Sequence, residues 1–313
     1  MVKKVQPRAD KRGQKYLRAE DLRYLKNLYL SARVVVDGAY SGRHKSPLKG
    51  YSQEFTDYRE YNPGDELKTI DWKAYARTDR YFIKLFEKET IMTSYLLVDS
   101  SASMGFGGSN YQKLFGTREI SKFDYACFLA AALSYLTVKQ GDKVGLTLFD
   151  SKVKCHVPAS STYKHLYRIL TQLEDNKVGE KTSISTVLRQ AFPLFKRKGV
   201  LILISDLLDE PEEIFGALDM YLHKNFEVIL FHVLHKYEMD LPQIPSVNFI
   251  DAENNERLTT KPGDIRDSYS RQLQEYIDSL SSMAQSRRVD YQLINTATPY
   301  QITLQDYILQ RRR

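Results

Sequence analysis

Apolar strand patterns and helical patterns alternate along the chain from Ser94 onward, and this alternation restricts the fold more than any other feature. Strands are predicted at the short apolar runs 96–98, 144–149, 153–157, 200–204, 228–233 and 291–294. Helices are predicted between or after them, at 122–139, 162–174, 184–197, 211–223 and 265–286. Such alternation favours an α/β fold with a doubly wound, mostly parallel sheet that is covered by helices on both faces. The runs 144–149 and 153–157 are close enough to form a hairpin, which predicts one antiparallel edge strand.

Two shorter segments precede this main domain. Apolar side chains at helical spacing predict an N-terminal helix over residues 18–36. Pro63 and Gly64 predict a type II turn inside a stretch rich in Tyr, Arg and Asp, and residues 81–86 have a strand pattern. We therefore expect four parts: a basic flexible tail at 1–17, a helix with a small β-rich module at 18–90, the main domain at 91–300, and a C-terminal helix with a basic tail at 301–313.

A polar cluster follows the first buried strand of the main domain. Asp99, Ser101 and Ser103 stand at alternating positions, so their side chains can converge on one point beyond the end of the strand. An all-oxygen site with few charges suits Mg²⁺. The alternative is that Asp99 only caps the next helix while the two serines form a polar turn, because these residue types also favour caps and turns.

Two further candidate ligands lie downstream. Thr182 immediately precedes a predicted helix, and Asp206 follows the strand at 200–204. In an open parallel sheet both would lie at the carboxyl edge, where such folds bind their ligands. Three other hydroxyl residues at the same helix start are alternatives to Thr182: Ser183, Ser185 and Thr186.

The order Asp99, Ser101, Ser103, Thr182 and Asp206 resembles the metal-ion-dependent adhesion site of a von Willebrand factor A domain. Upstream, the runs 50–55, 58–65, 69–72 and 76–77 resemble the signature of a bacterial von Willebrand A-like family catalogued as domain of unknown function fifty-eight. The similarity covers nearly the whole chain. One departure is Glu66, where many relatives have a second Asp, and this change keeps the charge.

This resemblance implies a binding role. The implied cofactor is Mg²⁺, with Mn²⁺ as a substitute, and the open coordination position of the ion takes an acidic residue of a protein partner. Members of the family are typically associated with MoxR-type AAA+ ATPases, so such an ATPase is the expected partner. The expected function is that of a non-enzymatic adaptor in the assembly or maturation of protein complexes, with no small-molecule substrate.

Five signature residues have no catalytic spacing: Arg59, Asp65, Asp71, Trp72 and Arg77. Two arginines and two aspartates in a short stretch can form bidentate ion pairs, which would hold the small module against the main domain with Trp72 buried at the junction. We favour this structural role because large aromatic side chains most often serve packing. The alternative is that the five residues form a docking surface.

A metal-dependent hydrolase is an alternative function, because a bound ion can also activate water. That chemistry requires a base near the ion, and the six histidines of the chain form no pattern typical of one. The glycines that follow Ser103 match neither a nucleophile elbow nor a phosphate-binding loop. We therefore expect no catalytic residues.

The net charge of +7 comes from the ends of the chain. Residues 1–18 carry seven basic residues against one acidic residue, and 311–313 are three arginines, so the remainder sums to about −2. A nucleic-acid binder that acts through these tails is thus a less favoured alternative. With two cysteines in no disulfide pattern and no apolar run long enough for a bilayer, we expect a cytoplasmic protein that reaches membranes only through partners.

Overall fold

The structure is a computed structural model of the 313-residue chain. It describes residues 15–18, 21–25, 54–62, 68, 70–87, 91–107, 120–179, 183–242, 247–250 and 257–310. The chain divides into two compact units, of which the smaller comprises residues 40–91 and the larger comprises residues 1–39 and 92–313. Each unit is described separately below.

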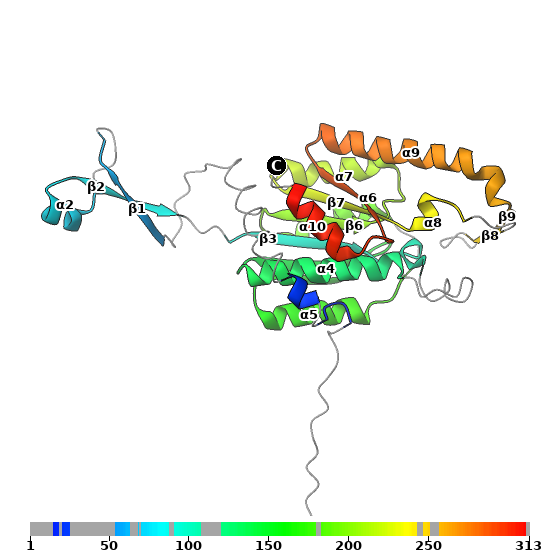
Figure 1. The fold of residues 1–313 in the computed structure, drawn as a ribbon, viewed down its shortest axis with the longest axis horizontal. Helices are drawn as coiled ribbons and strands as arrows, with labels where there is room; N and C mark the ends of the chain where they lie inside the picture. Colours follow the sequence, from blue (N-terminus) through cyan, green and yellow to red (C-terminus); the bar gives the residue numbers. More distant parts are fainter. Residues whose placement is uncertain are drawn as a thin grey trace, which may run out of the picture. The chain divides into compact units, whose positions relative to one another are not determined.

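A six-stranded sheet forms the centre of the larger unit (Figure 1). Its strands are β3 (Thr93–Asp99), β4 (Lys143–Phe149), β5 (Val153–Ser160), β6 (Val200–Ser205), β7 (Glu227–Leu234) and β10 (Asp290–Asn295). Their spatial order is β10-β7-β6-β3-β4-β5, and every pairing is parallel except the antiparallel one between β4 and β5. The predicted doubly wound sheet with one antiparallel edge strand is thus confirmed, and it is the topology that the resemblance to a von Willebrand factor A domain implied.

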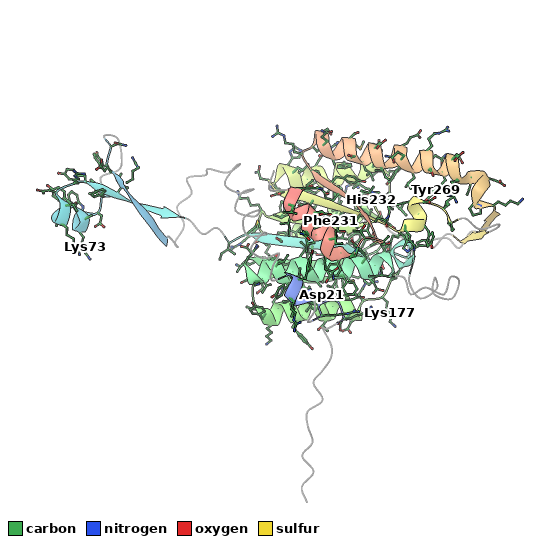
Figure 2. The ribbon with its side chains drawn as sticks, viewed as in Figure 1. Asp21, Lys73, Lys177, Phe231, His232 and Tyr269 are labelled. Carbon is green, nitrogen blue, oxygen red and sulfur yellow. The ribbon has the colours of Figure 1, made fainter. Side chains whose placement is uncertain are left out.

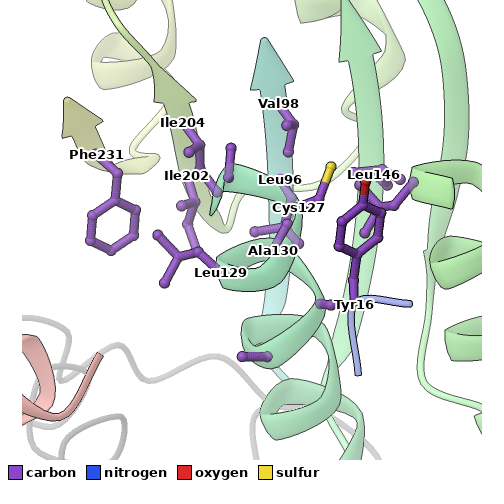
Figure 3. Close-up of a cluster of buried hydrophobic side chains, with 14 of the residues drawn as sticks. Tyr16, Leu96, Val98, Cys127, Leu129, Ala130, Leu146, Ile202, Ile204 and Phe231 are labelled. Atoms are coloured by element: carbon purple, nitrogen blue, oxygen red, sulfur yellow. The ribbon is translucent and has the colours of Figure 1, made fainter. Parts of the chain in front are cut away.

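Alternate side chains of β3 enter two separate cores, because successive residues of a strand point to opposite faces. Leu96 and Val98 belong to the core that includes residues of α4 (Lys122–Lys139), α5 (Tyr163–Asp175) and α10 (Tyr300–Gln310) (Figure 3). Tyr95 and Leu97 belong to the core formed with α6 (Ile184–Ala191), α7 (Pro211–His223) and α9 (Pro262–Ser286). Burial on both faces explains the continuous apolar run of this strand.

The N-terminal boundary differs from the expected one. Tyr16 and Leu25 are buried in the main core, and residues 21–25 are helical. Residues up to 39 group with the larger unit for this reason, rather than with the small module. Tyr16 is 2% exposed, so this residue does not belong to a flexible tail as expected for 1–17. The rest of the helix predicted at 18–36 lies outside the described residues.

The smaller unit contains one antiparallel hairpin and one short helix (Figure 1). The hairpin pairs β1 (Glu54–Glu60) with β2 (Phe82–Glu87), and α2 (Trp72–Thr78) lies between them in the chain. The strand predicted at 81–86 is confirmed as β2, whereas α2 was not predicted. The type II turn predicted at 62–65 falls on residues outside the described part of the chain.

Several shorter elements complete the larger unit. They are η2 (Ser103–Gly105), η3 (Phe192–Leu194), α8 (Lys236–Met239), and the hairpin of β8 (Val247–Ile250) with β9 (Arg257–Thr260). The helix predicted at 184–197 ends at Ala191, and the chain continues as η3, which contains Pro193. Within the described ranges, no helix has the length and apolar character needed to cross a membrane.

Candidate functional site

Two buried aspartates meet at the carboxyl edge of the sheet. Asp99 is the last residue of β3, and Asp206 directly follows the neighbouring strand β6. In the sheet, β3 lies between β4 and β6. The chain continues from β3 to β4 and β5 on one side, and then returns to place β6 on the other side of β3. The direction in which strands are added therefore reverses between β3 and β6. Open α/β sheets bind ligands at such a switch point. Both carboxylates are 0% exposed.

Asp99 accepts hydrogen bonds at both carboxylate oxygens. The Ser101 backbone N–H donates to Oδ1 at 2.8 Å, and the Ser205 hydroxyl donates to Oδ2 at 2.6 Å. Burial and the nearby charge of Asp206 raise the pKa of Asp99 to about 7. Asp99 does not cap a helix, because α4 is capped by Ser121 and η2 has no side-chain cap. The capping alternative is therefore wrong, and Asp99 organises the turn after β3.

The two serine hydroxyls after Asp99 face each other. Ser101 Oγ lies 3.1 Å from Ser103 Oγ, and both side chains are buried. The turn is held to the sheet by Ser100, whose N–H and hydroxyl donate to the Phe149 carbonyl at 2.7 and 2.8 Å. The hydroxyls of Ser101 and Ser103 are thus fixed side by side, as the alternating spacing predicted.

The two carboxylate oxygens of Asp206 have different surroundings. Lys122 donates to Oδ2 at 2.8 Å, whereas Oδ1 is buried and has no hydrogen-bond partner among the described residues. Burial acts to raise the pKa of Asp206, but the Lys122 ammonium outweighs it, and with a smaller contribution from the Ser103 hydroxyl the pKa is lowered. A buried, ionised oxygen without a partner is costly, so Oδ1 is a position that a cation would satisfy.

Lys122 and Glu238 complete the charged part of the site, and the sequence did not single out either residue. The Lys122 ammonium is 0% exposed and also lies 2.6 Å from Glu238 Oε1, on α8. Burial alone would lower the pKa of Lys122, but the two carboxylates raise it above its ordinary value. Lysine at the first position of a predicted helix has the pattern of a surface residue, so its role was not visible from the sequence.

The position of Thr182 is not described, since residues 180–182 lie outside the described part of the chain. The chain approaches the site just before this segment, because the Gly179 N–H donates to the Ser100 carbonyl at 2.7 Å. Of the alternative hydroxyls, Ser183 donates to Thr186 at 2.8 Å. The assignment of Thr182 therefore stays a prediction.

The structure describes four of the five signature residues of the smaller unit. Asp71 is buried and caps α2, where its Oδ1 accepts from the backbone N–H groups of Lys73 and Ala74 at 2.9 and 3.4 Å. Trp72 is 59% exposed, and Arg59 and Arg77 are exposed as well. The packing of Trp72 at a junction with the main domain stays a prediction. Asp65 lies outside the described residues. Lys73, which follows Trp72 on α2, is labelled in Figure 2.

His232, labelled in Figure 2, lies on β7 opposite Ser205 in the sheet and interacts electrostatically with Asp206. It is 0% exposed, its Nδ1 lies 2.7 Å from the Tyr291 hydroxyl, and burial lowers its pKa to about 4. In the part of the chain that the structure describes, no three His, Cys, Asp or Glu side chains form a metal cluster. A metal at this edge would therefore depend on hydroxyl ligands in addition to carboxylates.

Comparison with known proteins identifies related sequences. The family model described as "Protein of unknown function DUF58" matches residues 57–277. The uncharacterized protein Rv1480 of Mycobacterium tuberculosis is 26% identical over 252 residues, which are 79% of this chain and 76% of that protein. The uncharacterized protein Mb1516 of Mycobacterium bovis matches with the same values.

Solved structures with a similar fold are more distant. BatB from Bacteroides thetaiotaomicron is 15% identical, with a TM-score of 0.44, and the match covers 71% of this chain and 98% of that one. The VWA domain of SpRpn10 is 11% identical, with a TM-score of 0.39, and the match covers 69% and 94% of the two chains.

Proposed function

The chain belongs to the DUF58 family of proteins of unknown function, and from its site we propose that it is a non-enzymatic module that binds Mg²⁺ and, through the ion, a carboxylate of a protein partner. The observation that carries this proposal is the buried Asp206 Oδ1, which has no partner among the described residues. The oxygen belongs to an ionised carboxylate at the switch point of the sheet, close to the paired hydroxyls of Ser101 and Ser103.

The donor set fits Mg²⁺, which prefers oxygen ligands and keeps several waters. Ser101, Ser103 and Asp206 Oδ1 would hold the ion, with Thr182 as the further predicted ligand. Asp99 would not coordinate the ion directly, because its two oxygens already accept hydrogen bonds from the Ser101 N–H and the Ser205 hydroxyl. Its charge would attract the ion across the serine turn. When bound, Mg²⁺ supplies a centre of positive charge whose remaining coordination position can take an oxygen anion from outside.

The hydrogen bonds of the two aspartates support a binding role over hydrolysis. Asp99 accepts two hydrogen bonds, and one oxygen of Asp206 is held by Lys122. General base catalysis needs a basic group within hydrogen-bond reach of the attacking water. His232 is fully buried, and its ring lies against the Tyr291 hydroxyl. A phosphatase and esterase screen with and without Mg²⁺ is expected to show no turnover.

The proposed partner is a MoxR-type AAA+ ATPase, as the family resemblance implies, and the proposed role is that of an adaptor in complex assembly. The test is binding of the full chain to the ATPase from the same cell by biolayer interferometry, in Mg²⁺ and in EDTA. We expect EDTA and Ser101→Ala each to weaken binding at least tenfold. Ser134→Ala is the matched control, because Ser134 is a buried serine of α4 with no hydrogen-bond partner among the described residues.

Equal binding in Mg²⁺ and EDTA would contradict the proposal that the ion joins the two proteins. Equal loss in Ser101→Ala and Ser134→Ala would show that the effect comes from general destabilisation rather than from the site.

A further inference from the structure

Lys122 is a fully buried lysine whose ammonium lies between two carboxylates. Its Nζ is 2.8 Å from Asp206 Oδ2 and 2.6 Å from Glu238 Oε1, and its side chain is 0% exposed. Lysine is almost never fully buried unless it is paired. Replacing such a buried pair by apolar side chains is often neutral or stabilising, so the pair is not explained by stability alone.

Lys122 makes the two carboxylate oxygens of Asp206 unequal. Oδ2 accepts from Lys122, and Oδ1 remains for a second cation. A divalent ion at Oδ1 and the ammonium at Oδ2 would share one carboxylate, so the two cations repel each other across it. Because the ammonium is built into the fold, it cannot leave when the ion arrives.

Glu238 moderates this effect from the opposite side. Its Oε1 accepts from Lys122, and its Oε2 accepts from the His235 N–H at 2.7 Å, which closes the capping box of α8. The His235 ring contacts the ring of Phe106, just after the serine turn, with centroids 5.1 Å apart. The Phe106 carbonyl in turn accepts from the Lys122 N–H at 3.1 Å. Lys122 thus connects the site to α8 by both its side chain and its backbone.

We infer that Lys122 is an internal cation that regulates the proposed metal site: it shares Asp206 with the divalent ion and keeps the affinity of the chain for that ion low. This inference rests on the proposed function. With Asp99, Asp206 and Glu238 ionised, the three carboxylates and Lys122 sum to two negative charges, whereas the same site without Lys122 would carry three and would attract a divalent ion more strongly. Glu238 is 20% exposed and therefore offsets Lys122 less than a fully buried carboxylate would.

Two substitutions in the same network have opposite expected effects. Lys122→Met removes the internal cation and keeps the length of the side chain, so we expect the full chain to bind Mn²⁺ at least tenfold more tightly. Glu238→Gln removes the negative charge on the other side of Lys122, which leaves the ammonium to Asp206 alone, so we expect Mn²⁺ to bind about threefold more weakly. Lys139→Met, at the other end of α4, is the matched control and is expected to leave the affinity unchanged.

The measurement is isothermal titration of each variant with Mn²⁺, together with the rise in melting temperature that Mn²⁺ produces. If the role of Lys122 were purely structural, Lys122→Met and Glu238→Gln would both bind Mn²⁺ more weakly, or neither would. Unchanged or weaker binding by a folded Lys122→Met protein overturns the inference while the proposed function stands. If Lys122→Met does not fold, the Mn²⁺ affinity of Glu238→Gln tests the inference instead. Unchanged or tighter binding of Mn²⁺ by Glu238→Gln overturns it.

Failure of the proposed function is a different result. If the wild-type chain binds no Mn²⁺ but Lys122→Met does, the internal cation is confirmed and metal-dependent partner binding by the natural chain is overturned. If neither protein binds Mn²⁺, both proposals are wrong.

Discussion

The edge of the large sheet and the helix of the smaller unit both place an aspartate where a segment of chain turns, yet the two aspartates do different work. Asp71 directs one oxygen to two backbone N–H groups of α2, which is the ordinary task of a helix cap. Asp206 holds a buried lysine with one oxygen and leaves the other without a partner among the described residues. The difference lies in what surrounds the carboxylate, since both aspartates are buried.

The same contrast holds for the basic residues of the two regions. Lys122 is completely enclosed between Asp206 and Glu238, whereas Arg77 of α2 is exposed to solvent. Enclosed charges depend on each other, so the removal of one is expected to affect fold and binding together. Ion pairs between exposed charges contribute little to the free energy of folding.

Asp206→Ala is expected to lower the free energy of unfolding by about 3–5 kcal/mol, because it leaves Lys122 buried with Glu238 as its remaining carboxylate. Urea denaturation monitored by circular dichroism measures the change. A loss below about 1 kcal/mol would show that Lys122 is solvated in solution and that the edge does not differ from α2.

The pH dependence of the edge follows from Asp99, whose pKa is raised to about 7 by burial and by Asp206. Since an unfolded Asp titrates near 4, the folded protein binds the proton more tightly, and the metal-free protein loses stability as the pH rises from about 4 to about 7. Metal binding has the opposite sign, because the ion needs the ionised carboxylate. We expect affinity for Mn²⁺ to fall by up to about tenfold per pH unit below 7.

Asp99→Asn provides the control for this pH dependence. Its amide does not titrate, so both the stability slope between pH 4 and 7 and the pH dependence of Mn²⁺ affinity should flatten. If the slopes of the variant and the wild-type chain are the same, another group carries the pH dependence.

Asp71→Ala in the smaller unit is expected to destabilise by about 1 kcal/mol, the usual effect of losing a helix cap. It should leave Mn²⁺ affinity unchanged, in contrast to Asp99→Asn. Thermal melting and metal titration of the same sample measure both quantities. A change in Mn²⁺ affinity would show that the signature residues participate in the metal site.

Arg77→Ala is expected to change the free energy of unfolding by less than about 0.5 kcal/mol, because the side chain is exposed. A buried ion pair, the role we favoured from the sequence, would instead cost about 3–5 kcal/mol. If melting is normal, binding to the ATPase decides whether Arg77 belongs to a docking surface. Normal melting together with normal ATPase binding would exclude both roles for Arg77.

The sequence predicted most of the large unit because strands buried on both faces and amphipathic helices have distinct patterns. It also predicted the meeting of Asp99, Ser101, Ser103 and Asp206, since neighbouring parallel strands end at the same edge of a sheet. Lys122, Ser205 and Glu238 were missed. Lys122 is separated from Asp206 and Glu238 by 84 and 116 residues, and no local pattern shows that a charged residue on a helix faces inward.

The missed features of the smaller elements have a related cause. The pattern at 72–78 is short, and its N-cap Asp71 was interpreted as half of an ion pair rather than as the start of a helix. Tyr16 was assigned to a flexible tail because its neighbours are charged, yet it is buried and its hydroxyl donates to Asp124 at 2.6 Å. A contact with a distant part of the chain fixes Tyr16, and sequence patterns do not contain such contacts, whereas the cap of α2 is local and was misinterpreted.

The most direct test of the metal site is a crystal of the full chain soaked in Mn²⁺, with data collected to show the anomalous scattering of manganese. We expect one peak at the carboxyl edge of the sheet, among the hydroxyls of Ser101 and Ser103 and Asp206 Oδ1. A Ser101→Ala crystal should show a weaker peak or none. Absence of a peak at this edge in the wild-type crystal, or a peak only at another position, would contradict the proposed site.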